Sequence, residues 1–143
     1  ESITGMSLRY FGPGEYPYKT VLSEKTCESI PYVFRNIWYY THVIHNNEAD
    51  FYSRRIVFLI LGLDSFTSAE YMPDVTDTTE TGWIKDHIFT DEILKCLEFL
   101  ENRDYIYTIS VQGHSDYLAE PIQDPPEVRV AGVEDQKKNG YFW

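Results

Sequence analysis

Two apolar runs constrain the fold of this chain more than any other feature. Residues 39–45 and 105–111 are rich in β-branched and aromatic side chains, and each run leads into a histidine, His45 or His114, among polar residues. Runs of this length and composition predict β-strands. Helical patterns precede and separate them, and this order predicts an α/β fold with a mostly parallel sheet and flanking helices. Parallel strands end at one edge, so both imidazoles are expected there, where open α/β sheets bind ligands.

Three helical segments are predicted to cover the sheet. The first begins at N-cap Ser29 with Pro31 in its first turn, the second runs from N-cap Asp50 to the residue before Gly62, and the third spans 87–101. Apolar spacing predicts their buried faces, namely Ile30, Val33, Phe34 and Ile37, then Ile56, Leu59, Ile60 and Leu63, then Ile88, Ile93, Leu94, Leu97 and Leu100. Glu92 is expected to face water. Three shorter elements are also predicted, namely a helix near 3–8 and strands at 65–67 and 128–133.

Charge and composition limit the classes of function. The 143 residues, 43% of them hydrophobic, fit one globular domain with a real core. A net charge of −11 argues against a nucleic-acid partner, since phosphates would be repelled over most of the surface. An anionic ligand remains compatible with this charge if the basic groups gather in one cleft. The available cluster is Arg9, Arg54 and Arg55 with His42 and His45.

Recognisable catalytic and metal-binding motifs are missing from the sequence. It contains no phosphate-binding glycine loop, no nucleophile elbow and no HExxH or HxH spacing. Cys27 and Cys96 lie in helix-like segments without zinc-site spacing, so free buried thiols are expected. No apolar run reaches the roughly 18 residues that a membrane span needs. We therefore predict neither a catalytic residue nor a metal ligand within this chain.

The segment that follows the first predicted strand has the residue types that bind an oxyanion. His45 is followed by Asn47, then Tyr52 and Arg54 return after a short aromatic segment. Arginine offers a planar fork of donors to a phosphate or sulfate ester, and histidine offers a proton that titrates near neutrality. The alternative interpretation is a strand that simply ends in polar surface residues.

The order of several short motifs resembles one known family. They are Ser-Ile-Pro-Tyr-Val-Phe (29–34), Thr-His-Val-Ile-His-Asn-Asn (41–47), Phe-Tyr-Ser-Arg (51–54), Leu-Gly-Leu-Asp-Ser-Phe (61–66), Gly-Trp (82–83), Phe-Thr-Asp-Glu-Ile-Leu (89–94) and Ile-Ser-Val-Gln-Gly-His-Ser-Asp-Tyr (109–117). Together they resemble the middle of a lipoteichoic acid synthase-type sulfatase domain. Such domains are bacterial phosphoglycerol transferases of the alkaline phosphatase superfamily. The resemblance implies that residues 1–143 are one internal part of an alkaline phosphatase-like α/β sandwich.

The resemblance also implies substrate-binding roles for five residues. His45 matches the pocket histidine at the strand end, His114 matches the histidine that contacts phosphoglycerol, and Arg54 matches the pocket arginine. Asn47 stands where some members have Asp, and Tyr52 stands where Trp is frequent. Arg55 has no counterpart. The family's catalytic Thr, metal-binding Glu and Asp-His metal ligands are expected outside this segment, as is the divalent cation, commonly manganese.

These matches lead to a functional expectation with one alternative. The chain is expected to be the substrate-pocket part of a membrane-anchored enzyme on the extracellular face of a bacterial plasma membrane. It would act on a glycerophosphate or sulfate ester and be inactive alone. Its expected partners are the rest of the catalytic domain and, through surfaces that this domain would cover, other copies of the chain. The alternative is a non-catalytic α/β module that binds an anionic ligand or a partner protein.

Overall fold

A three-stranded parallel sheet forms the centre of the molecule. The computed structural model describes residues 2–73, 75–99 and 103–114. The strands are β1 Tyr39–His45, β2 Ser65–Ser68 and β3 Arg103–Ile109, in the order β2-β1-β3. Both pairings of β1 are parallel, and His45 is level with Ser68 on one side and Ile109 on the other. The predicted parallel α/β sheet is therefore confirmed, including the brief strand at 65–67; the predicted strand at 128–133 lies outside the described residues.

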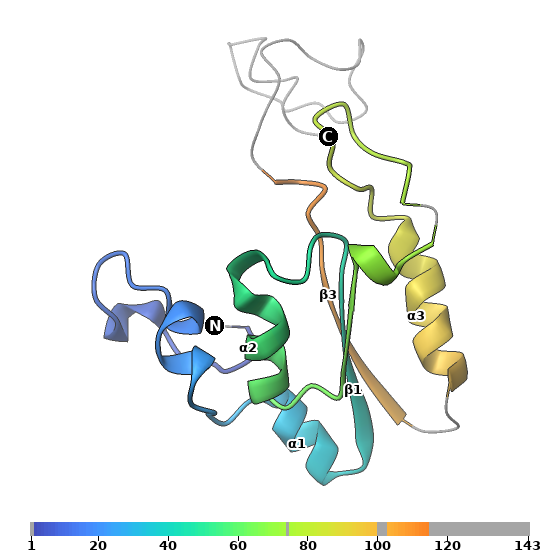
Figure 1. Cartoon of the computed structure of the whole chain (residues 1–143). Helices are drawn as coiled ribbons and strands as arrows, with labels where there is room; N and C mark the ends of the chain where they lie inside the picture. Colours follow the sequence, from blue (N-terminus) through green and yellow to red (C-terminus); the bar gives the residue numbers. More distant parts are fainter. Residues whose placement is uncertain (1, 74, 100–102, 115–143) are drawn as a thin grey trace, which may run out of the picture.

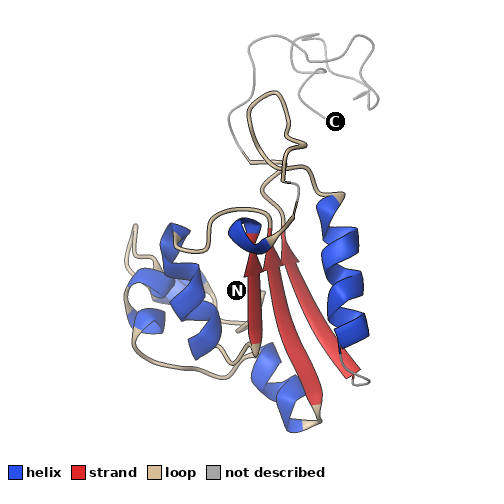
Figure 2. Ribbon diagram, turned by 45° about the vertical axis from the view of Figure 1, so that its right-hand side comes forward, coloured by secondary structure: helices blue, strands red, loops and turns tan. Residues whose placement is uncertain are grey.

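Helices cover both faces of the sheet (Figure 1, Figure 2). The α-helices are α1 Ile30–Asn36, α2 Arg54–Ile60 and α3 Ile88–Phe99, and single 3-10 turns occur at Leu8–Tyr10, Pro17–Lys19, Val21–Ser23, Phe51–Ser53 and Ala69–Tyr71. Val43 of β1 packs with Val57, Phe58 and Leu61 around α2, whereas Ile44 packs with Phe89 of α3 on the opposite face. Cys27 and Cys96 belong to these separate clusters. The N-terminal segment forms a 3-10 turn at Leu8–Tyr10 instead of the predicted helix near 3–8.

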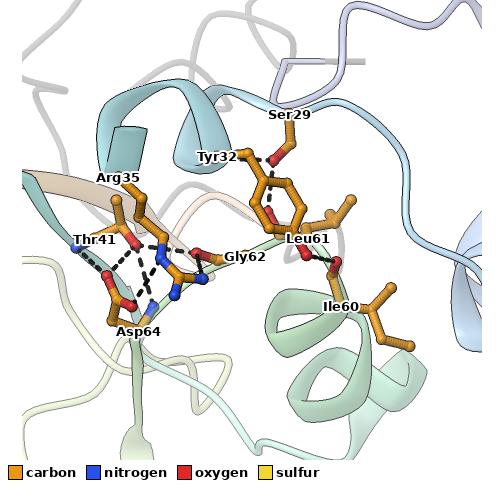
Figure 3. Close-up of polar contacts among 8 residues, drawn as sticks. All are labelled: Ser29, Tyr32, Arg35, Thr41, Ile60, Leu61, Gly62 and Asp64. Atoms are coloured by element: carbon orange, nitrogen blue, oxygen red, sulfur yellow. Dashed lines mark hydrogen bonds and ion pairs between the residues drawn. The ribbon is translucent and has the colours of Figure 1, made fainter. Parts of the chain in front are cut away.

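Side chains of α1 and β1 anchor the C-terminal end of α2 (Figure 3). Ser29 Oγ donates to the Leu61 carbonyl at 2.5 Å, and Tyr32 Oη donates to the Ile60 carbonyl at 2.8 Å. Thr41 Oγ1 donates to the Gly62 carbonyl at 3.2 Å. Gly62 has φ +87°, as predicted for a residue that ends a helix, and an added Cβ would meet the Tyr32 ring at 2.8 Å. The carbonyls that α2 cannot pair internally are thus satisfied by its neighbours.

The predicted buried faces of the three helices are wrong in part. Ile30, Val33 and Ile37 are 38%, 51% and 52% exposed, and α1 buries Pro31 instead. Hydrogen bonds from Ser29 and Tyr32 to the carbonyls at the C-terminal end of α2 fix the orientation of α1. Ile56 and Leu59 of α2 are also exposed. In α3, Leu94 and Leu97 are about half exposed, whereas Phe89 and Glu92 are buried.

Two of these differences have identifiable local causes. Tyr52 and Ser53 have φ +59° and +55°, so the helix cannot start at Asp50 and begins at Arg54. Within α2, Val57 and Phe58 are buried, whereas Ile56 and Leu59 are exposed. Glu92, predicted to face water, is buried because Lys95 lies 2.5 Å from its carboxylate and covers it. A buried carboxylate is tolerated when a cation pairs with it.

Candidate substrate-binding site

His45 ends β1 and lies in a fixed hydrogen-bonding environment. Its side chain is almost fully buried, with a relative exposure of 1%. Nδ1 lies 2.7 Å from the Ile109 carbonyl oxygen of β3, and Nε2 contacts Nη1 of Arg54. A carbonyl only accepts and a guanidinium only donates, so Nδ1 carries the proton and Nε2 is the acceptor. The geometry therefore requires the neutral imidazole.

Electrostatics favours the same protonation state of His45. Burial lowers the pKa of the imidazole, and the positive charge of Arg54 lowers it further, although the Ile109 carbonyl opposes the shift. The neutral ring accepts a hydrogen bond from the guanidinium and so fixes its direction. In this arrangement His45 orients Arg54 and does not present a free proton to a ligand.

Arg54 is positioned by the irregular backbone that precedes α2. The left-handed conformations of Tyr52 and Ser53 fold the chain back, so that the first residue of α2 meets the end of β1. The Arg54 guanidinium carbon lies 5.4 Å from the Phe51 ring centroid and 5.7 Å from that of Tyr52. Burial lowers the pKa of Arg54, yet no carboxylate of the described residues forms an ion pair with it. A partly buried cation without an acidic partner is suited to an anionic ligand.

Tyr52 belongs to an aromatic cluster that borders Arg54. Its ring stacks on Tyr16 with centroids 6.5 Å apart and meets Tyr18 edge-on at 5.2 Å. Lys19 Nζ lies 4.7 Å from the Tyr52 centroid. The pKa of Tyr18 is raised by burial and by the two neighbouring tyrosines, while Arg54 acts in the opposite direction. The segment 16–19 was not assigned to the site from the sequence, and its Tyr-Pro-Tyr-Lys composition gave no spacing signal.

Asn46 is a site residue that sequence reasoning missed. It is fully buried and donates through Nδ2 to the Ile84 carbonyl at 2.9 Å and to Asp86 Oδ1 at 3.1 Å, while its Oδ1 accepts from Val111 N at 2.8 Å. Ser110 Oγ also donates to Asp86, at 2.7 Å. Asn46 thus ties the loops after β3 and before α3 to the end of β1. The available signal was strand phase, because Asn46 continues the buried face of His42 and Ile44.

Asn47 and His114 lie at the same edge of the sheet but have different partners. The Asn47 side-chain oxygen accepts from Glu48 N at 2.9 Å, and its backbone oxygen accepts from Ala69 N at 3.1 Å. Asn47 therefore shapes the turn after β1. His114 is exposed and packs on Trp83, with ring centroids 4.9 Å apart. No hydrogen bond joins either side chain to the His45–Arg54 pair in the part of the chain that the structure describes.

Three members of the predicted basic cluster lie elsewhere. His42 points to the opposite face of β1 and pairs with Asp104 Oδ1 at 3.0 Å and Ser65 Oγ at 2.7 Å, because alternate strand residues face opposite sides. The Arg9 guanidinium donates to Tyr10 Oη at 2.9 Å. Arg55 is exposed and lies 3.8 Å from Asp50. The expected gathering of five basic groups is thus wrong, and Lys19 accompanies Arg54 instead.

A metal ion has no suitable ligands in the described segments. Among residues 2–73, 75–99 and 103–114, no group of three or more His, Cys, Asp or Glu side chains could hold one. Nor does any helix in these segments have the length and apolar character needed to cross a membrane. The described site consists of the neutral His45 ring, the cations Arg54 and Lys19, and aromatic rings.

Comparisons with known proteins agree with this architecture. The Rhizobium meliloti (strain 1021) protein named for cyclic beta-1,2-glucan modification is 28% identical over 119 residues, which are 83% of this chain and 18% of that protein. The lipoteichoic acid synthase LtaP of Listeria monocytogenes has a TM-score of 0.71 and 21% identity, covering 99% of this chain and 34% of its own. An alkaline phosphatase superfamily protein of Vibrio parahaemolyticus has a TM-score of 0.65 and 17% identity, covering 98% and 33%.

The chain therefore spans about a third of the solved structures that it resembles, and a smaller share of the Rhizobium protein. Both structures have the alkaline phosphatase-like α/β fold that the motif resemblance implied, and the parallel sheet with flanking helices agrees with it. The family model for sulfatases matches residues 1–139, which is nearly the whole chain. The chain belongs to the Sulfatase family.

Proposed function

We propose that this chain is the substrate-binding part of a bacterial cell-envelope enzyme that transfers phosphoglycerol or hydrolyses a related phosphate or sulfate ester. The observation that carries the proposal is the His45–Arg54 pair. A neutral, buried imidazole accepts from one guanidinium N–H, and this is the hydrogen bond that Arg54 forms within the described residues. Its remaining N–H groups are available to the oxygens of an anionic ester.

The His45–Arg54 pair is suited to binding an anionic ester because the direction of the Arg54 guanidinium is set before the ligand binds. The His45 ring is fixed by the Ile109 carbonyl of β3, and α2 is anchored at its other end by Ser29, Tyr32 and Thr41. A donor that is already oriented loses little conformational entropy on binding. Asn47, Tyr52 and His114 would complete the pocket at the same edge of the sheet.

The remainder of the catalytic machinery is assigned to other segments of the enzyme. The described residues do not fit a divalent cation, and the proposed manganese-activated Thr lies outside residues 1–143. The exposed apolar residues of α1 and α2, which include Val33, Ile37 and Leu59, supply a surface for packing against those segments. The names of the relatives point to envelope polymers, a glucan or a lipoteichoic acid, as the acceptor of the transferred group. Such an acceptor would place the enzyme on the extracellular face of the plasma membrane.

Substitution of Arg54 tests the proposal, and its neighbour Arg55 provides a matched control. In the complete enzyme, Arg54→Ala should lower kcat/KM for a phosphoglycerol donor about 10-fold to 100-fold, because a hydrogen bond to a charged group contributes about 1.5–3 kcal/mol. The free energy of unfolding should be affected far less than turnover, although His45 Nε2 loses its donor. Arg55→Ala removes the same charge from an exposed position 3.8 Å from Asp50 and should leave turnover unchanged.

Four results would contradict the assignment in different ways. Equal losses of stability and activity in Arg54→Ala would indicate a structural arginine. Equal effects of Arg54→Ala and Arg55→Ala would indicate general surface electrostatics. Ester binding without turnover by the complete protein would favour the non-catalytic module, and turnover by the isolated 143 residues would show that the catalytic groups had been misplaced.

A further inference from the structure

The turn that precedes α2 has an unfavourable backbone conformation. Tyr52 and Ser53 are consecutive left-handed residues, with φ +59° and +55°. Residues other than glycine rarely adopt this region, because their Cβ approaches the following carbonyl oxygen. A right-handed conformation at both residues would instead extend α2 toward Asp50, which is the helix start that the sequence predicts. Contacts that exist only in the observed conformation must therefore offset the cost of the left-handed turn.

Tyr52 makes such contacts with aromatic side chains from the N-terminal part of the chain. Its ring meets Tyr18 edge-on, with centroids 5.2 Å apart, and stacks on Tyr16 at 6.5 Å. Tyr16 is exposed, whereas Tyr18 is partly buried, follows the buried Pro17 and packs against the core cluster around α2. The ring of Tyr18 therefore has a fixed position against which the Tyr52 side chain can rest.

The direction of the Arg54 guanidinium depends on the same turn. The guanidinium contacts His45 Nε2, and its carbon lies 5.4 Å from the Phe51 ring centroid and 5.7 Å from the Tyr52 centroid. The far end of α2 is held by hydrogen bonds from α1 and β1, so a change at the turn would move the two rings and leave the helix in place. A right-handed turn would therefore remove both rings from the Arg54 side chain.

We propose that Tyr18 is a positioning residue of the substrate site, which holds the left-handed turn through its ring contact with Tyr52 and so keeps Arg54 directed at His45. In this role Tyr18 does not contact the ligand. It favours one of two conformations of the segment before α2, and only the favoured conformation is competent to bind. The inference rests on the proposed function, because Tyr18 positions the arginine of the same site.

Tyr18→Leu tests this role, because leucine keeps an apolar side chain against the core and removes the ring. In the complete enzyme, Tyr18→Leu should raise KM for a phosphoglycerol donor about fivefold and change kcat little. The loss of an edge-on aromatic pair shifts a conformational equilibrium by about this factor, and saturating substrate restores the binding-competent turn. Side-chain ¹⁵N NMR of the variant without ligand should show a weaker hydrogen bond at His45 Nε2.

Ser53→Gly distinguishes positioning from core packing. Glycine adopts the left-handed conformation without strain and disfavours the competing helix, so Ser53→Gly should return the KM of Tyr18→Leu to near the wild-type value. Ser53 is exposed, and its replacement cannot repair a defect of the core. Tyr18→Phe keeps the ring and should behave as the wild type. Tyr10→Leu removes a ring that is 74% exposed and should leave KM unchanged. Thermal unfolding of each variant verifies that it is folded.

The possible failures are distinguishable. If Tyr18→Leu keeps the wild-type KM and the wild-type His45 signal, the positioning role of Tyr18 is overturned and the proposed function stands. If Ser53→Gly does not lower the raised KM of Tyr18→Leu, or if Tyr10→Leu raises KM as much, the action of Tyr18 through the turn is overturned. If Arg54→Ala leaves turnover unchanged while Tyr18→Leu still alters the His45 signal, the proposed function is overturned and the positioning of Arg54 by Tyr18 stands.

Discussion

His42 and His45 lie in the same strand and are both buried, but their surroundings differ in kind. His42 lies between a hydroxyl and a carboxylate, with Ser65 Oγ at 2.7 Å and Asp104 Oδ1 at 3.0 Å. His45 lies between the Ile109 carbonyl and the Arg54 guanidinium. The His42 ring links the three strands on the face of the sheet that α3 covers. The His45 ring orients the Arg54 guanidinium at the edge of the sheet. Sequence spacing alone places the two histidines on opposite faces of the strand, and only their partners distinguish the structural role of His42 from the role proposed for His45 in ligand binding.

The largest effect expected from this comparison is on stability, through His42. Asp104→Ala removes the carboxylate partner of His42. The His42 and Asp104 side chains are only 6% and 3% exposed, so the partner is lost from a buried position. The loss should be about 3 kcal/mol in the free energy of unfolding, because a buried polar N–H is left unpaired. Chemical denaturation measures it. Asp104→Asn keeps an acceptor oxygen and should lose less, and Asp50→Ala, which removes an exposed carboxylate, should change stability little.

If Asp104→Ala were as stable as the wild type, the structural role proposed for His42 would be wrong. If that variant instead lost ester binding while it remained folded, the contrast between the two histidines would be reversed. Arg54→Ala should show the opposite pattern, with binding reduced far more than stability.

A smaller effect is expected in the pH dependence of stability, through His45. Its pKa in the folded state is lowered by burial and by Arg54, so the unfolded chain binds the proton more readily. Stability should therefore be fully present above the unfolded value near 6.5 and should decrease as pH falls below it, until the folded imidazole is protonated as well. His45→Gln should remove this component, so the difference between wild type and variant in urea denaturation at pH 7 and pH 5 isolates it. If the stability of His45→Gln falls as steeply between pH 7 and pH 5 as that of the wild type, other groups account for the pH dependence.

The strands could be predicted from the sequence because their signal is local. The β-branched run at 39–45 coincides with β1. The alternation of helices and strands along the chain favours a parallel sheet, which is the sheet observed. The helix faces could not be predicted reliably from apolar spacing. Both α1 and α2 have apolar residues on more than one side. The side that is buried depends on the hydrogen bonds from Ser29 and Tyr32 to the carbonyls of Leu61 and Ile60 at the end of α2.

The site was predictable in its residue types but not in its contacts. Spacing and family resemblance selected His45, Tyr52 and Arg54, which the structure brings together. The left-handed conformation of Tyr52 is what turns Arg54 toward His45, and no residue preference indicates it, since a tyrosine rarely adopts positive φ. The contacts of Lys19 with Tyr52 and of Asn46 with Ile84, Asp86 and Val111 join distant parts of the sequence, so strand phase could indicate that Asn46 is buried but no local motif could identify these partners.

The most direct test of the central claim is the protonation state of His45 in the folded protein. Side-chain ¹⁵N NMR near pH 6.5 distinguishes a protonated ring nitrogen from an unprotonated one. We expect a neutral His45 ring with the proton on Nδ1 and an unprotonated Nε2, both before and after addition of glycerol 3-phosphate, and loss of the Nε2 hydrogen-bond signature in Arg54→Ala. A doubly protonated ring, or a neutral ring with its proton on Nε2, would contradict the claim that His45 orients Arg54 toward the ligand.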